Sequence, residues 1–173
     1  MLKEIDIKSL TFNPFERIGK DWCLITAGTP DSFNTMTASW GGVGILWNKE
    51  VATCYIRPQR YTKQFVDRED LFTLTFFPDG YRDALALCGR VSGRDHDKPA
   101  EAGITPLFTD GTVAFSEADL ILVCRKLYAQ EMTEDSFIDK KVLELDYPSR
   151  DLHTIYVGEI VKAYSASRVK SEE

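Results

Sequence analysis

Six stretches of the chain have the pattern of β-strands, with apolar residues that alternate with polar ones or run together over strand lengths. They are rich in the β-branched and aromatic residues that strands favour. The six stretches are residues 22–28, 35–40, 51–57, 71–77, 120–130 and 154–164. Turn-forming sequences separate them, at 29–34, 78–80, 109–111 and 147–149. Because strands and helices do not alternate along the chain, we expect an all-β fold with short helices, built as an antiparallel barrel or sandwich.

Three short helices are predicted between these strands. One lies in residues 61–70, with Thr62 as its N-cap. A second lies in residues 80–89, where apolar side chains recur at helical spacing and Gly89 ends the pattern. A third, in residues 97–103, has a proline in its first turn and a closing glycine.

The remaining segments are less regular. The glycine pair at 41–42, with Gly44 close behind, indicates a bulge or a tight bend. Residues 134–146 fit either a helix or a covering loop. We expect residues 168–173 to be an unstructured tail.

Composition narrows the class of protein. With 173 residues, 43% apolar and 28% charged, the chain fits a single globular domain over residues 1–173. Its longest apolar run, residues 120–124, is far shorter than a membrane span, and the N-terminus lacks a secretory pattern, so we expect a cytoplasmic protein with no membrane partner. The net charge of -6 argues against a nucleic-acid partner, because phosphate backbones require broad basic surfaces.

The four cysteines lie about thirty residues apart without a CxxC pair, and only two histidines could join them. We therefore expect no metal site. The favoured interpretation is that all four are reduced thiols packed in the core.

Against this acidic background, RPQRYTKQF (57–65) gathers two arginines and a lysine without any acid. A strand is predicted to end at Arg57 and a helix to begin near Thr62, so unpaired amides would point outward beside Arg57, Arg60 and Lys63. Such a corner suits a phosphate monoester. An equally weighted alternative is a solvated helix start whose cations pair with Asp67 or the acids at 69–70.

Two further stretches carry polar groups in patterns that suit a ligand. In FNTMTASW (33–40), alternation places Thr35, Thr37 and Ser39 on one face, where a flat heteroaromatic ring could approach the main chain. Composition alone favours a solvent-facing strand here. GRVSGRDHDK (89–98) is a surface loop whose serine and cations could donate to a ligand, or whose charges could satisfy one another.

The ordered succession NTMTASW, RPQRYTKQF, FTLTFF, SGRDHDK, EADLILVCRKLY and HTIYVGEI resembles the flavin reductase-like, FMN-binding split-barrel family, in particular its flavoredoxin-like branch. The resemblance spans roughly residues 11 to 165. It implies a six-stranded antiparallel Greek-key split barrel and a homodimer, with FMN near the subunit interface.

The resemblance also implies cofactor-binding positions. One group would border the isoalloxazine ring, a second would surround the phosphate, and a third would close over the flavin as a loop. These groups are Met36, Thr37, Ala38, Ser39 and Trp40; then Arg57, Pro58, Arg60, Tyr61 and Thr62; then Ser92, Gly93 and Lys98.

The activity implied is hydride transfer from NAD(P)H to flavin. No GxGxxG motif is present, so a nicotinamide would share the flavin cleft. A second hypothesis is an FMN electron carrier served by a redox protein partner, and a third is a barrel for another phosphorylated heteroaromatic such as a pyridoxal derivative. No catalytic residue is predicted, and a structural role is favoured for His153 over contact with nicotinamide or flavin.

Overall fold

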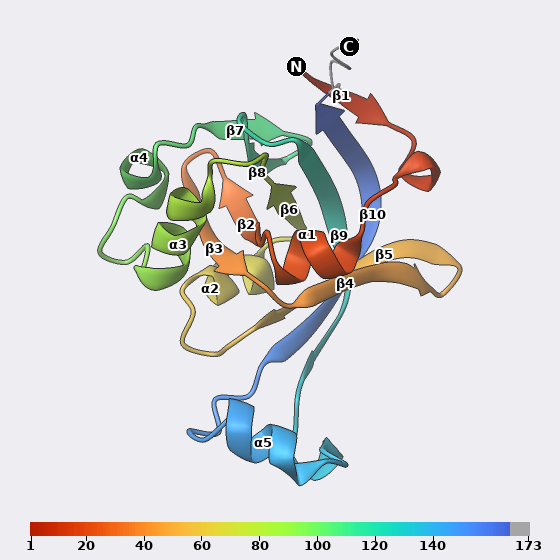
Figure 1. The fold of residues 1–173 in the computed structure, drawn as a ribbon, viewed down its shortest axis with the longest axis vertical. Helices are drawn as coiled ribbons and strands as arrows, with labels where there is room; N and C mark the ends of the chain where they lie inside the picture. Colours follow the sequence, from red (N-terminus) through yellow and green to blue (C-terminus); the bar gives the residue numbers. More distant parts are fainter. Residues whose placement is uncertain (167–173) are drawn as a thin grey trace.

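The computed structural model describes residues 1–166, whose centre is an antiparallel sheet curled into an open barrel (Figure 1). Along the sheet the strands follow the order β3, β2, β6, β9, β10, β5 and β4, with β1 added beside β10; β7 and β8 form a separate hairpin. The strands are β1 (Leu2–Ile5), β2 (Cys23–Thr29), β3 (Ser32–Ala38), β4 (Gly41–Leu46), β5 (Lys49–Ile56), β6 (Leu71–Phe76), β7 (Pro106–Thr109), β8 (Thr112–Phe115), β9 (Leu120–Glu131) and β10 (Thr154–Ala166).

The prediction of an all-β antiparallel barrel with short helices is confirmed. The six predicted strands correspond to β2, β3, β5, β6, β9 and β10, which are adjacent in the sheet. Their bounds differ most at β3, which begins at Ser32 and ends at Ala38. The predicted turn at 29–34 is therefore narrower than expected, and Trp40 lies outside the strand. The predicted tail at 168–173 lies outside the described residues.

The prediction of a bulge or bend at the glycines of residues 41–44 was wrong. Gly41–Leu46 is a regular strand whose pairing with β5 runs without a shift from Gly41 opposite Cys54 to Leu46 opposite Lys49. Trp47 and Asn48 make the connecting turn with positive φ angles of 52° and 57°. A hairpin turn of this hand is usually marked by a glycine, which is missing here, so the sequence did not reveal the hairpin.

Short helices surround the barrel; α3 lies against β2 and β3, and α4 packs beside α3 (Figure 1). The helices are α1 (Pro14–Gly19), α2 (Thr62–Arg68), α3 (Arg82–Arg90), α4 (Lys98–Ala102) and α5 (Lys140–Asp146), with short 3-10 turns at Ile7–Ser9 and Glu134–Ser136. The third predicted helix is confirmed as α4, capped by Asp97 and closed by Gly103 at φ 67°.

The predicted ends of two other helices were wrong. Thr62 is not the N-cap but the first residue of α2, and Tyr61 takes the N-cap position. The buried hydroxyl of Thr62 accepts a hydrogen bond from Asn34 Nδ2 at 2.9 Å. Gly89 does not end α3, which continues to Arg90. Residues 134–146 resolve into a 3-10 turn followed by α5.

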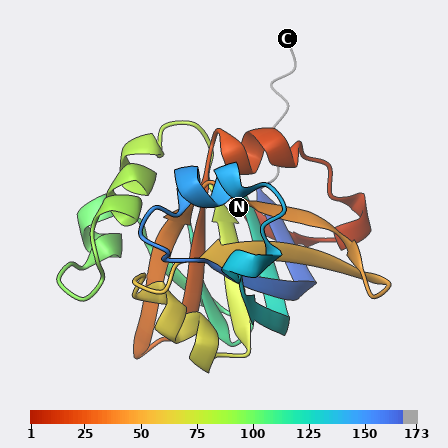
Figure 2. The same cartoon turned by 90° about the horizontal axis from the view of Figure 1, so that it is seen from below.

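The barrel interior is filled by the inward residues of β2, β5, β6, β9 and β10, including Phe72, Phe76 and Tyr156, which are fully buried. Burying side chains of this size is worth about 1.5–3 kcal/mol each, so the core holds the sheet together. Between β9 and β10 the chain leaves the barrel as an arm, residues 132–153, that carries α5 (Figures 1 and 2). The arm returns to the barrel at the end of β5, where it meets the candidate site.

Candidate functional site

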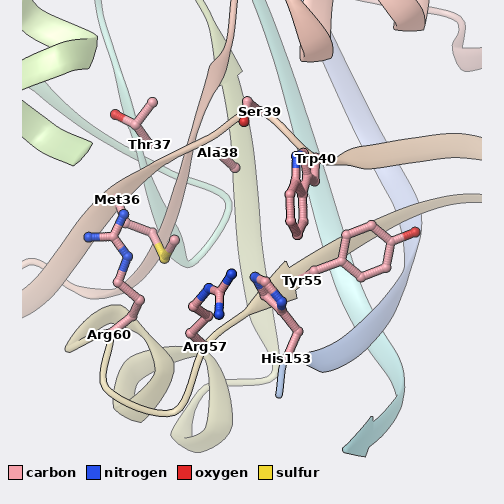
Figure 3. Close-up of a pocket in the computed structure, with 9 residues that line it drawn as sticks. All are labelled: Met36, Thr37, Ala38, Ser39, Trp40, Tyr55, Arg57, Arg60 and His153. Carbon is pink, nitrogen blue, oxygen red and sulfur yellow. The ribbon is translucent and has the colours of Figure 1, made fainter. Parts of the chain in front are cut away.

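A cleft opens where the barrel is split, between the end of β3 and the start of β4 (Figure 3). β3 and β4 lie at opposite ends of the strand order and are not hydrogen bonded to each other. Residues 39–40 connect them across the split. The end of β5 and the residue before β10 complete the walls. The residues that line this cleft are Met36, Thr37, Ala38, Ser39, Trp40, Tyr55, Arg57, Arg60 and His153.

A second pocket adjoins the cleft and is called here the cationic pocket. It shares Met36 and Arg60 with the cleft and lies between the start of α2 and the loop that follows α3. Its lining is Met36, Gln59, Arg60, Tyr61, Thr62, Arg90, Val91, Ser92, Arg94 and Lys98. All the predicted cofactor-binding residues except Pro58 and Gly93 line one of the two pockets.

Four cations line the cationic pocket without a partner of opposite charge. Arg60, Arg90, Arg94 and Lys98 have no carboxylate within 4.0 Å in the part of the chain that the structure describes. In a chain with a net charge of -6, unpaired positive charge gathered in one concave place is the exception. A donor set of this kind fits an anion.

Arg60 is the cation that joins the two pockets. Its Nη1 donates to the carbonyl of Gly89 at 2.8 Å, at the C-terminal end of α3. A guanidinium has five N–H groups, so most of its donors are left for a ligand. Burial is the main cause that lowers the pKa of Arg60 from its usual value, and the nearby charge of Arg57 adds to it.

Lys98 is the most deeply placed of the four cations, with only 3% of its surface exposed. Its ammonium donates to the carbonyls of Thr35 at 2.8 Å and Cys88 at 2.9 Å, which leaves one of three N–H groups for a ligand. Burial is the main cause that lowers the pKa of Lys98 to about 8, and the charge of Arg60 adds to it. An anion in the pocket would relieve this unfavourable environment.

The loop over the cationic pocket is held by close contact with β3. Gly93 packs so tightly against Asn34 that a Cβ at this glycine would lie 1.9 Å from the side-chain amide oxygen, Oδ1, of Asn34. Asn34 is itself bonded to Thr62, so this amide ties the loop to the first turn of α2. Gly93 thus positions the loop, although it does not line the pocket.

The corner at residues 57–65 differs from its predicted form in two ways. The amides of Arg60, Lys63 and Gln64 are used in local turns, by the carbonyls of Arg57, Arg60 and Tyr61. Two of the three predicted cations are also neutralised, because Arg57 pairs with Asp151 and Lys63 with Asp67, each at 2.8 Å. Positive charge for an anion therefore comes from Arg60 and from the three cations at 90–98, which lie at the end of α3, in the loop after it and at the start of α4.

The hydroxyl groups of Thr35 and Thr37 in β3 form hydrogen bonds within the protein. Thr35 Oγ1 is hydrogen bonded to Thr26 Oγ1 at 2.8 Å, and Thr37 Oγ1 donates to the carbonyl of Leu85 in α3 at 2.5 Å. Composition had favoured side chains that face solvent, but Thr35 is buried and Thr37 is half-buried. Although Thr37 lines the cleft, Figure 3 shows its hydroxyl directed away from Arg57 and His153. A flat ligand in the cleft would instead meet the main chain, Ala38 and the ring of Trp40.

His153 is a cleft residue that sequence reasoning placed in a structural role. Its ring lies 5.2 Å from that of Trp40, centroid to centroid, and its Nδ1 is 2.6 Å from the hydroxyl of Tyr147 in the arm. Burial and the nearby charge of Arg57 lower the pKa of His153 to about 4, so the imidazole is neutral at pH 7. Tyr55 and Arg90 were missed as lining residues, because only the fold brings them to the two pockets. Arg94, one of the donors expected in the loop 89–98, lines the cationic pocket.

The cysteines lie outside both pockets and are buried, and burial raises the pKa of Cys23 to about 12 and of Cys88 to about 11, which makes them poor nucleophiles. Within residues 1–166, no three histidine, cysteine or acidic side chains gather as a metal site would require. The same residues contain no helix long and apolar enough to cross a membrane.

Similarity to known proteins agrees with this geometry. The Flavin reductase like domain family matches residues 15–172. The fold is similar to an FMN-binding domain of a flavin reductase-like enzyme from Shewanella baltica, with a TM-score of 0.68, 13% identity and coverage of 95% of this chain and 77% of that chain. It is also similar to a flavoredoxin from Methanosarcina acetivorans, with a TM-score of 0.68, 21% identity and coverage of 85% and 69%.

A third similar structure is an NADH:FAD oxidoreductase from Streptomyces globisporus in complex with NAD and FAD fragments, with a TM-score of 0.63, 16% identity and coverage of 84% of this chain and 74% of that chain. No curated protein sequence matches the chain. The predicted split-barrel fold is confirmed by these structures. Because the family match covers most of the sequence, this chain belongs to the flavin reductase-like domain family.

Proposed function

We propose that the chain binds FMN, with the phosphate in the cationic pocket and the isoalloxazine ring in the cleft, and acts as an NAD(P)H-dependent flavin oxidoreductase. The observation that carries this proposal is the set of four cations, none of them paired with a carboxylate of residues 1–166, beside the cleft at the split of the barrel. A phosphate monoester has enough acceptor oxygens to engage Arg60, Lys98 and their neighbours together. Bound FMN would supply the chemistry of hydride and electron transfer, which amino-acid side chains do not provide.

The residues of the chain have binding and positioning roles in this proposal. Arg60 and Lys98 would hold the phosphate, and the ring of Trp40 would support the flavin. The neutral His153, oriented by Tyr147, would offer a hydrogen bond at the edge of the cleft. A nicotinamide would have to share this cleft, since no dinucleotide-binding motif is present in the sequence.

The activity is tested by adding NADH or NADPH to the FMN-loaded protein without oxygen and following the visible absorbance of the flavin. We expect prompt bleaching with at least one of the two donors. Colour that persists with both would contradict the reductase and favour an electron carrier, the function that the name of the similar Methanosarcina flavoredoxin describes. A colourless preparation that takes up no FMN would contradict both.

A pH dependence follows from the buried ammonium of Lys98. The pKa of Lys98 is about 8 in the free protein, and a bound dianion raises it, so binding takes up a proton between the two values. FMN affinity should therefore fall as the pH rises above about 8, by roughly tenfold per unit at most. Fluorescence titration at neutral and alkaline pH measures this. Riboflavin should show no such loss, and Lys98→Met should flatten the FMN profile; an equal loss for both flavins would contradict the assignment.

The homodimer stays a prediction. The described surface carries exposed apolar side chains on the β4–β5 hairpin and on the arm, including Ile45, Trp47, Ile138 and Leu145, which suit a subunit interface.

A further inference from the structure

Arg94 ties together the two segments between which the cationic pocket lies. It belongs to the loop after α3, and its side chain reaches the segment that leads into α2. The guanidinium carbon of Arg94 lies 4.6 Å from the centre of the Tyr61 ring, and Nη1 donates to the carbonyl of Gln59 at 3.4 Å. A guanidinium over an aromatic ring is attracted to its face. Arg94 therefore bridges residues 59–61 and the loop after α3.

Both ends of this bridge are held by the protein itself. The loop makes a tight turn, in which the amide of Arg94 donates to the Ser92 hydroxyl at 3.2 Å and the amides of residues 95 and 96 donate to the Ser92 carbonyl at 3.1 Å. At the other end, the side chain of Gln59 donates to Asp151 of the arm at 2.7 Å. The bridge is thus in place before any ligand binds.

The bridge lies on the outer side of the cationic pocket. Lys98 and Thr62, which also line the pocket, have 3% and 1% of their surfaces exposed, whereas Arg94 is exposed. The pocket has a volume of about 170 Å³, below the range of about 300–1,000 Å³ for pockets that hold a whole small ligand. A space of this size, with a buried floor and Arg94 over its outer side, accommodates the end of a ligand but not the middle of a longer one.

The two common flavin nucleotides differ in this respect. FMN ends at its phosphate, whereas the corresponding phosphate of FAD continues into a second phosphate and an adenosine. Both carry about two negative charges at pH 7, the FMN monoester because its second pKa is about 6, so the four cations do not by themselves distinguish them. The fold does not decide either, since the similar structures include an FMN-binding domain and an NADH:FAD oxidoreductase.

We propose that Arg94 determines which flavin nucleotide the chain binds. By reaching across to Gln59 and Tyr61, it closes the cationic pocket around a terminal phosphate, so that FMN is accepted and the adenylyl group of FAD has no path out of the pocket. The proposal rests on the proposed function, which places a phosphate in this pocket. It adds the residue that selects between the two nucleotides.

Replacing Arg94 with alanine distinguishes this role from that of a simple phosphate ligand, because the two roles predict opposite signs for FAD. The loss of a cation that only contacts phosphate weakens every phosphorylated flavin. The loss of a side chain that obstructs the adenylyl group strengthens FAD while it weakens FMN. Specificity of this kind comes from an obstacle to the wrong ligand as well as from contacts to the right one.

The experiment is a calorimetric titration of the apoprotein with riboflavin, FMN and FAD at pH 7. We expect the wild type to bind FMN about tenfold or more tightly than FAD, and FAD about as weakly as riboflavin. Arg94→Ala should bind FAD about threefold or more tightly than the wild type, and FMN less tightly than the wild type. Wild-type protein that binds FMN and FAD equally would overturn the proposal.

Two further variants complete the series. Arg90→Ala is the matched control, because Arg90 lines the same pocket at the end of α3 while the contacts across to Gln59 and Tyr61 are made by Arg94. It should weaken FMN and FAD alike. Tyr61→Leu keeps all four cations and removes the ring beneath Arg94, so it should also raise FAD affinity. If FAD affinity falls or stays unchanged in both Arg94→Ala and Tyr61→Leu, Arg94 does not select the flavin.

The three flavins separate the failure of this proposal from the failure of the proposed function. Protein that binds none of them contradicts the proposed function. Protein that binds FMN and FAD with the same affinity contradicts only the role of Arg94.

Discussion

Replacing Arg60 with alanine should weaken FMN binding by roughly 10- to 150-fold and riboflavin binding by less than about threefold. Arg60 is the cation that lines both pockets, and it has no carboxylate partner in the described part of the chain. Charge-assisted hydrogen bonds are worth about 1.5–3 kcal/mol each, and only FMN has the phosphate to accept them. Fluorescence titration of the apoprotein with each flavin measures the ratio.

Arg68→Ala is the matched control for Arg60→Ala. Arg68 belongs to the same helix, α2, but it is exposed and its guanidinium pairs with Glu69 at 2.8 Å. It should bind both flavins as the wild type does. If Arg60→Ala weakens riboflavin as much as FMN, the phosphate does not lie at Arg60.

Replacing Gly93 with valine should weaken FMN by at least about tenfold and lower the free energy of unfolding by about 1–3 kcal/mol, the usual cost of overpacking. A Cβ here would lie 1.9 Å from Oδ1 of the Asn34 side chain, and Asn34 is buried. Either the loop lifts, which displaces the cations after α3, or Asn34 turns and loses its bond to Thr62. Chemical denaturation and flavin titration of one preparation measure both effects.

Gly44→Val in β4 is the control for Gly93→Val, because a Cβ at Gly44 meets nothing within 4 Å. It should match the wild type in FMN affinity and lose little stability. Wild-type FMN affinity in a folded Gly93→Val protein would show that the position of this loop is not needed for the phosphate.

The main sheet was predictable because the residues within each of its strands favour a β conformation. Segments such as Leu71–Phe76 and Leu120–Glu131 are apolar and rich in β-branched or aromatic residues, which form strands in many contexts. The strand Gly41–Leu46 was not, because three of its six residues are glycine and its stability comes from pairing with β5. The short strand Leu2–Ile5 likewise depends on β10, which is far along the chain.

The candidate site could be predicted only as far as its contacts are local. The pairing of Lys63 with Asp67 is a contact across one helical turn and was among the expected alternatives. The pairing of Arg57 with Asp151 joins residues 94 positions apart through the arm, and no pattern in either segment signals it. Alternation placed Thr35 and Thr37 on one face correctly, but it could not show that α3 covers that face or that Thr35 pairs with Thr26 of the neighbouring strand.

A crystal structure of the protein grown with FMN tests the central claim most directly. The account predicts the phosphate between Arg60 and Lys98 in the cationic pocket, with the isoalloxazine ring in the cleft beside Trp40. A flavin whose phosphate lies in solvent, or whose ring lies outside the cleft while a carboxylate of the protein pairs with Arg60, would contradict it.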